Sequence, residues 1–118
     1  MEMKILDLVL DSCCYLMIEL DRKHEEYREM NPYWRKRLAL YDSIGSLIGT
    51  NPEGYTHVRF RRGYANRHTM LFELDGITVG RGNPDWGAPT DRDVFILKIG
   101  RRVDETDNQV PQGGKSKE

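Results

Sequence analysis

The stretch YTHVRFRRGYANRHTMLFELDGITVGRG, from Tyr55 to Gly82, decides the fold class of this chain. Basic and apolar residues alternate over positions 57–61, which is the period of a strand with one face in the core. Positions 70–74 are mostly apolar and run into Asp75-Gly76, a dipeptide that favours a two-residue hairpin turn. The stretch therefore predicts an antiparallel sheet in which an arginine-bearing strand is followed by a hairpin over positions 70–79.

The sequence after this stretch adds a loop and a last strand. Positions 93–103 have the centre VFILKI, which predicts a central strand or one covered on both faces. The loop over positions 80–92 is long for a small domain and carries Trp86 among polar neighbours. Trp86 either anchors a binding partner or folds back onto the sheet.

The sequence before the stretch predicts two helices. Apolar residues recur at three- and four-residue spacing over positions 4–30, and again after Asn31-Pro32 up to position 48. We expect an α+β fold in which two N-terminal helices pack on an antiparallel sheet of about four strands. Positions 1–103 form one domain, and the polar positions 104–118 form a disordered tail. A first helix of this length would extend past the domain, so it either supports a homodimer or is covered by the second helix.

The composition bounds the function classes. The chain has 118 residues, a net charge of -1 and a mean hydropathy of -0.68, and it has no apolar run of the roughly 18 residues that span a membrane. Carboxylates at positions 2, 7 and 11 interrupt any signal-peptide core, so we expect a cytoplasmic protein without a membrane partner. Cys13 and Cys14 are adjacent and predict two reduced, buried thiols. No Cys/His spacing indicates a metal site, and no motif indicates a cofactor.

The net charge conceals a basic middle third. Positions 1–31 carry -4, positions 32–68 carry +5, and positions 69–118 carry -2. The candidate binding residues are the cations of this block together with the loop tryptophan: Arg35, Lys36, Arg37, Arg59, Arg61, Arg62, Arg67 and Trp86. The first three are predicted in the first turn of the second helix, where they either hold an anion or pair with the glutamates of positions 25–29. Glu73 is placed to neutralise part of the arginine-bearing strand.

Three function classes follow from these residues. The sequence favours a small non-enzymatic regulator, adaptor or inhibitor that docks on a protein partner through the arginine-rich surface and the Trp86 loop. The alternative is a nucleic-acid-binding module that uses the basic middle third. A second alternative is a nuclease or phosphodiesterase that uses His57 and His68 as acid and base across the predicted first hairpin.

Overall fold

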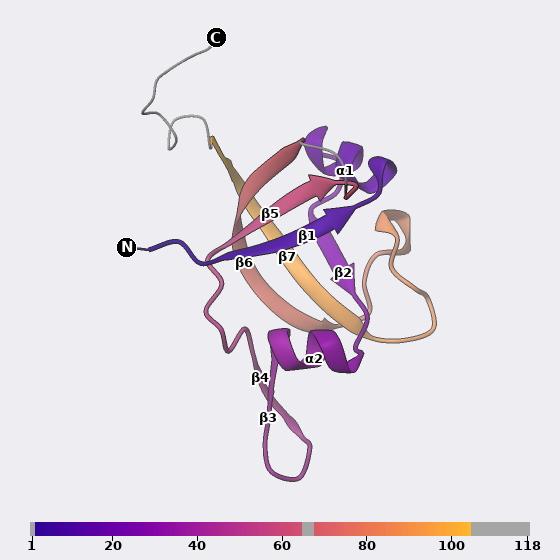
Figure 1. Cartoon of the computed structure of the whole chain (residues 1–118). Coiled ribbons are helices and arrows are strands. Elements are labelled where there is room, and N and C mark those ends of the chain that lie inside the picture. The colour runs from indigo at the N-terminus through magenta and orange to yellow at the C-terminus, as the bar shows by residue number, and fades with distance from the viewer. Residues whose placement is uncertain (1, 65–67, 105–118) are drawn as a thin grey trace.

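The computed structural model describes residues 2–64 and 68–104, and it confirms the α+β class (Figure 1). The elements are β1 (Ile5–Leu10), α1 (Ser12–Glu19), β2 (Glu25–Arg28), α2 (Pro32–Leu38), β3 (Ala39–Tyr41), β4 (Leu47–Thr50), β5 (His57–Arg62), β6 (Thr69–Gly80), the 3-10 turn η1 (Pro84–Trp86) and β7 (Val94–Val103). Five strands form a curled, mostly antiparallel sheet in the order β1-β5-β6-β7-β2. β3 and β4 form a separate hairpin that projects from the body beside α2. Positions 105–118 of the predicted tail, which was expected to begin at position 104, lie outside the described residues.

The N-terminal segment is not the predicted long helix. Leu6, Leu8 and Leu10 also fit a period of two, and β1 pairs in parallel with β5 so that these side chains enter the core. The Asp11 carboxylate then caps α1 by accepting a hydrogen bond from the Cys14 backbone N–H at 2.7 Å. α1 ends after eight residues, where Asp21 takes a positive φ of 62°. The prediction of a homodimer therefore loses the overhanging helix on which it rested.

The cysteines of α1 also differ from the expectation. Both are free thiols, but Cys13 is exposed and Cys14 is half-buried. The prediction of two buried thiols is therefore wrong, because α1 contacts the core with only one face. The buried residues of that face are Tyr15 and Ile18, and Cys14 packs against the core beside them.

The second helix begins as predicted and ends early. The Asn31 side chain accepts a hydrogen bond from the Trp34 backbone N–H at 3.0 Å, and Pro32 takes the first helical position. The helix stops at Leu38, and the next residues turn back as the β3–β4 hairpin. The Asp42 carboxylate closes this hairpin by accepting from the backbone N–H groups of Ile44 and Ser46.

The predicted turn at Asp75-Gly76 is absent, because both residues lie inside the twelve-residue strand β6. β6 pairs with β5 through positions 69–73 and with β7 through positions 71–80. Its register with β7 shifts on either side of Leu74, and such bulges bend a strand. The long apolar β7 thus pairs with the whole segment that was expected to fold on itself.

The core lies inside the curl of the sheet. It comprises Leu6, Leu8, Leu10, Tyr15, Ile18, Leu38, Ala39, Val58, Phe60, Met70, Phe72, Ile77, Phe95 and Leu97. A second, smaller cluster of Tyr27, Ala88, Val94 and Ile96 lies on the opposite face of β7, with Trp86 against it. β7 is therefore covered on both faces, as the sequence predicted. No helix of the described residues is long and apolar enough to cross a membrane.

Candidate functional site

The arginines of β5 do not share one surface. Arg59 and Arg61 lie on the outer face of the sheet, because the residues that alternate with them, Val58 and Phe60, are buried. Arg62 follows the inner alternation, and its guanidinium lies 6.0 Å from the Tyr15 ring. Arg67 lies outside the described residues. The predicted arginine-rich surface therefore reduces, on this strand, to Arg59 and Arg61.

Acidic side chains partly neutralise the outer face. Asp7 pairs with Arg59 at 3.4 Å across the parallel β1–β5 register. Glu73 lies opposite His57 in the register, but its carboxylate pairs with Arg101 of β7 at 3.2 Å. The prediction that Glu73 pairs with an arginine of β5 is therefore wrong, because the arginine that it meets belongs to β7.

The basic cluster of α2 lies in the last turn of that helix. Because α2 has only seven residues, Arg35, Lys36 and Arg37 are near its C-terminus, where cations are favourable. Arg37 stacks on Tyr33 with its guanidinium carbon 3.6 Å from the ring centroid. The predicted placement of these cations in the first turn is therefore wrong, and the anion site proposed there loses its helix N-terminus.

The alternative pairing with the glutamates of positions 25–29 is also wrong. Glu25 accepts from the Tyr27 hydroxyl. Glu26 pairs with Lys23 and Arg28, and Glu29 pairs with Arg92 at 2.7 Å. The guanidinium of Arg92 lowers the pKa of Glu29.

The two candidate catalytic histidines lie at opposite ends of the β5–β6 pair. His57 begins β5, and the backbone carbonyl of His68 accepts from the N–H of Arg62 at the other end. Five residues of strand separate these positions by about 16 Å at ~3.3 Å per residue. The prediction that they are neighbours is wrong, so this pair cannot act on one phosphodiester.

Trp86 folds back onto the body of the domain, which was one of the two alternatives predicted for it. It is half-buried, and its ring stacks on His24 at 5.7 Å between centroids. The backbone N–H of Asn83 donates to the Tyr27 hydroxyl at 2.9 Å, which ties the loop to β2. Burial raises the pKa of Tyr27 to about 12, so this hydroxyl stays protonated at neutral pH.

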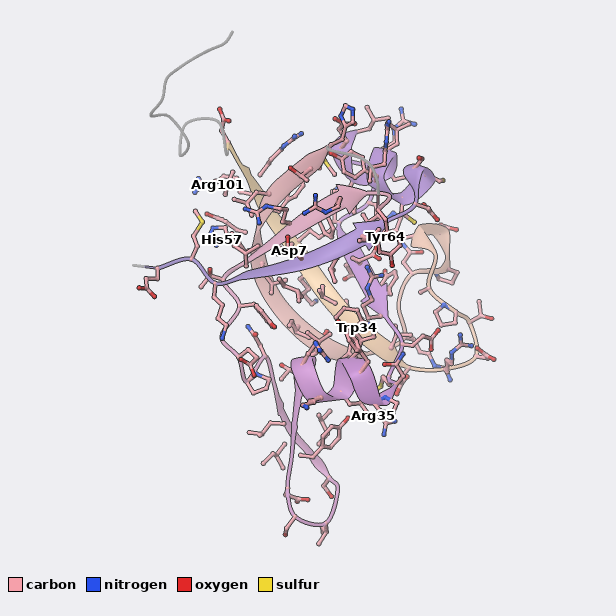
Figure 2. All side chains as sticks on the ribbon, viewed as in Figure 1. Asp7, Trp34, Arg35, His57, Tyr64 and Arg101 are labelled. Carbon is pink, nitrogen blue, oxygen red and sulfur yellow. The ribbon has the colours of Figure 1, made fainter. Side chains whose placement is uncertain are left out.

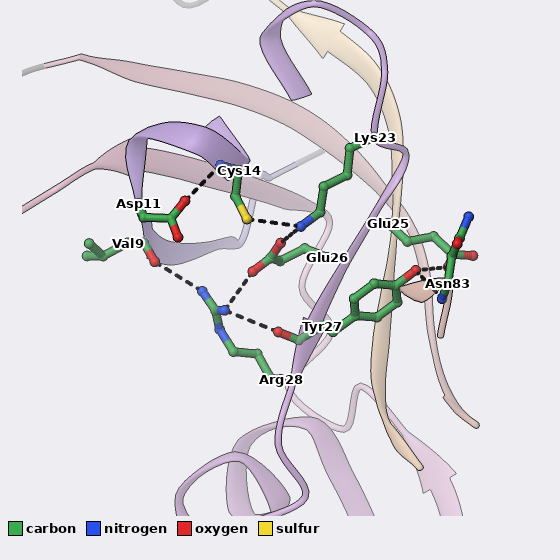
Figure 3. Close-up of polar contacts among 9 residues, drawn as sticks. All are labelled: Val9, Asp11, Cys14, Lys23, Glu25, Glu26, Tyr27, Arg28 and Asn83. Atoms are coloured by element: carbon green, nitrogen blue, oxygen red, sulfur yellow. Dashed lines mark hydrogen bonds and ion pairs between the residues drawn. The ribbon is translucent and has the colours of Figure 1, made fainter. Parts of the chain in front are cut away.

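The most unusual feature of the molecule is a buried ion cluster of Lys23, Glu26 and Arg28, which the sequence analysis missed (Figure 3). Lys23 Nζ lies 2.8 Å from Glu26 Oε1, and Arg28 Nη1 donates to Glu26 Oε2 at 2.7 Å. Lys23 and Glu26 are only 3% and 4% exposed. Charges removed from water in this way cost several kcal/mol each, so the cluster persists only if its members stay paired.

The ion cluster lies where the sheet fails to close. β1 and β2 are the two edge strands, and the gap between their outer edges is called the seam here. Arg28 spans the seam, because its guanidinium donates to the carbonyls of Val9 on β1 at 3.2 Å and Tyr27 on β2 at 3.1 Å. One side chain thus replaces the backbone ladder that would otherwise join these strands.

Arg28 lines several cavities at this bridge. One, of about 340 Å³, is lined by Cys14, Lys23, Glu26 and Trp86 among others. Lys23 Nζ lies 3.4 Å from Cys14 Sγ there, yet burial raises the pKa of the Cys14 thiol. A thiol with a raised pKa is a poor nucleophile, so this cavity is suited to binding rather than to covalent catalysis.

A further cavity, of about 440 Å³, lies between β1 and α2. It is lined by Asp7, Leu8, Val9, Arg28, Tyr33, Trp34 and Tyr64. In Figure 2, Trp34 lies between α2 and the sheet, and Tyr64 lies near the end of β1. Among residues 2–64 and 68–104, no three His, Cys, Asp or Glu side chains gather as metal ligands.

Exposed apolar side chains concentrate on the β3–β4 hairpin. Leu40, Ile44, Leu47 and Ile48 are 49%, 85%, 40% and 60% exposed. Their spacing predicts the apolar face of the second helix, which would place them in the core. The alternative signal was the turn sequence DSIGS at positions 42–46, in which an aspartate precedes a glycine with a positive φ of 90°.

Comparisons of the chain with protein-family models, curated proteins and solved structures give no match.

Proposed function

We propose that this chain is a non-enzymatic binding protein that docks on a protein partner, and that the β3–β4 hairpin is its main contact element. The observation that carries the proposal is the exposure of four large aliphatic side chains on a hairpin that projects from the body. An isolated two-stranded hairpin is only marginally stable in water. An exposed apolar patch on such an element is typical of a protein interaction site.

The size of the patch suits binding. The four exposed fractions add to a little more than two whole Leu or Ile side chains. Burying that surface in a partner contributes roughly 4–7 kcal/mol at about 1.5–3 kcal/mol per side chain. Part of this free energy is lost to the cost of association, so the hairpin needs further contacts.

The charge of the hairpin favours a protein partner over a nucleic-acid partner. Asp42 is the only charged residue between positions 39 and 50, and its carboxylate is engaged by the turn. Phosphate recognition needs cations, and the hairpin has none. Arg35 lies on the side of α2 from which the hairpin projects, so it can form a polar rim to the contact (Figure 2).

The test compares three forms of the full chain as bait in extracts of the cells that make it. The double variant Ile44→Asp/Ile48→Asp removes the apolar surface, and Leu16→Asp is the control, since Leu16 is also exposed, at 45%, but lies on α1. We expect the wild type and Leu16→Asp to retain one protein at high salt and after nuclease treatment, and the double variant to lose it. Circular dichroism confirms that all three are folded.

Two outcomes contradict the proposal. Equal retention by the double variant would show that the hairpin is not the contact element. Loss of the partner on nuclease treatment, together with sensitivity to Arg59→Ala/Arg61→Ala, would favour nucleic-acid binding.

A further inference from the structure

Strand β1 is paired on one side only. The carbonyl of Lys4 accepts from the N–H of Thr56 at 2.8 Å, and the carbonyl of Leu10 accepts from the N–H of Gly63 at 3.0 Å, so the even-numbered residues direct their backbone groups toward β5. Because the direction alternates along a strand, Ile5, Asp7 and Val9 direct their N–H and C=O groups toward the seam.

The outer edge of β1 is open over most of its length. The Arg28 guanidinium donates a hydrogen bond to the carbonyl of Val9. No backbone group of residues 2–64 and 68–104 pairs with Ile5 or Asp7 on that side. Natural sheets protect such edges with proline, a bulge or a covering segment, because an open edge pairs with other chains. β1 contains no proline, and its register with β5 is regular.

A cavity lies directly against this edge. Three consecutive β1 residues, Asp7, Leu8 and Val9, line the 440 Å³ cavity. Consecutive residues point to alternate faces of a sheet, so a cavity that touches all three borders the backbone edge. Its other walls are aromatic, and the Arg28 guanidinium lies 5.5 Å from the Trp34 ring centroid.

From these observations we infer that β1 accepts an extended peptide segment of a protein partner as an added strand. The peptide backbone pairs with the outward N–H and C=O groups of Ile5 and Asp7, and one large apolar side chain of the peptide enters the cavity beside Trp34. Main-chain pairing supplies affinity and the cavity supplies selectivity, which is the general arrangement of strand addition. This site is separate from the hairpin and goes beyond the function proposed above.

A second copy of the chain fits this edge less well than a foreign peptide. Antiparallel pairing of two β1 edges about Asp7 would bring two carboxylates opposite each other, and like charges at directly opposed positions destabilise a sheet. A partner peptide has no such restriction.

The test uses linear random peptides displayed on phage and selected on the immobilised full chain. Asp7→Pro removes the outward N–H without breaking the β1–β5 ladder, since proline is tolerated where the N–H faces away from the sheet. Asp7→Ala is the matched control, because it removes the pair with Arg59 but keeps the N–H. We expect selected peptides to bind Asp7→Ala within about threefold of the wild type and Asp7→Pro about tenfold more weakly, as the loss of one buried hydrogen bond predicts.

A second measurement needs no variant of the protein. Methylation of successive peptide nitrogens should abolish binding at alternate positions and spare the positions between them, because only every second N–H joins a ladder. The hairpin variant Ile44→Asp/Ile48→Asp should bind these peptides like the wild type, so failure of one proposal leaves the other standing.

Three results would overturn the inference. The first is that no peptide is selected, and the second is that binding does not depend on the position of N-methylation. The third is that the wild type forms a concentration-dependent dimer and that Asp7→Pro abolishes this dimer. The last result would assign the edge to a second copy.

Discussion

Replacing Glu26 with leucine should destabilise the fold far more than the loss of one surface carboxylate. Glu26 joins Lys23 Nζ at 2.8 Å and Arg28 Nη1 at 2.7 Å. In Glu26→Leu, Lys23 keeps the Cys14 sulfur at 3.4 Å and the Tyr27 ring at 5.8 Å but has lost its carboxylate, although it is only 3% exposed. Removal of one member of a buried pair typically costs about 3–5 kcal/mol, against a total stability of about 5–15 kcal/mol for a domain.

Two further variants separate the charge effect from the shape effect. Lys23→Met leaves Glu26 paired with Arg28 and should cost about 1.5–3 kcal/mol, the contribution of one charge-assisted hydrogen bond. The double variant Lys23→Met/Glu26→Leu removes the stranded ammonium. It should therefore be more stable than Glu26→Leu alone, since apolar replacement of a whole buried pair is often neutral.

Urea unfolding followed by circular dichroism measures these differences through the midpoint and the m-value. Glu53→Leu is the control, because Glu53 pairs with Lys4 at 3.0 Å on the surface and should cost about 1 kcal/mol or less. The reasoning fails if Glu26→Leu costs no more than this control. It also fails if the double variant is as unstable as the sum of its two single variants.

Three other predictions follow from the same region of the molecule. Cys14 should be alkylated more slowly at neutral pH than the exposed Cys13, because burial raises the pKa of the Cys14 thiol and leaves less thiolate. Peptide mass spectrometry measures both alkylation rates, and equal rates would contradict the burial of Cys14. Stability should fall between about pH 10 and pH 12, because the pKa of Tyr27 is raised to about 12 in the fold and the unfolded chain loses this proton first. Tyr27→Phe should flatten that part of the stability profile in urea titrations, and an unchanged slope would assign the loss to other groups. Gly82→Ala should destabilise the fold by about 1–3 kcal/mol and lower the melting temperature. The reason is that the new methyl group would lie 2.5 Å from the Tyr27 ring and 2.7 Å from the Ala88 side chain. An unchanged melting temperature would refute the close packing of this loop.

The fold class could be predicted because its signals are local. The alternation over positions 57–61 and the apolar run of the last strand each encode a strand without reference to the rest of the chain. The N-terminus misled the sequence analysis because Leu6, Leu8 and Leu10 fit a strand, while Leu6, Val9 and Cys13 fit a helix. β5 decides between them by offering β1 a parallel partner, and no window of the N-terminal sequence contains that information.

The hairpin predicted at Asp75-Gly76 failed for a related reason. A two-residue turn would pair seven or eight residues of β6 with each other, whereas β7 offers a partner along almost the whole strand. The longer ladder buries more apolar surface and satisfies more backbone groups, so tertiary pairing overrides the local turn preference. Conversely, the β3–β4 turn depends on one aspartate within an apolar sequence that also suits a helix.

The candidate sites, too, could be predicted only where the signal is local. Composition located the cations of positions 32–68, but it could not say which of them meet a carboxylate, because Asp7 and Arg59 are neighbours only through the β1–β5 register. Lys23, Glu26 and Arg28 belong to a segment that is polar in sequence. Lys23 and Glu26 are buried, and Arg28 is half-buried, because β2 lies beside the end of β1.

Both surfaces proposed for binding arise where the sheet stops short of closing. β2 has four residues, and after it the chain leaves the sheet to form α2 and then the hairpin. A longer β2 would pair with β1 along its whole length and would remove both the open edge and the need for Arg28. The chain instead joins the edges with one guanidinium, so among residues 2–64 and 68–104 the outward backbone groups of Ile5 and Asp7 have no backbone partner. The segment that leaves β2 carries Ile44 on the exposed hairpin. A sheet held in this way is more costly to stabilise, because it requires the buried ion cluster, and the open edge that results is the feature a partner strand can use.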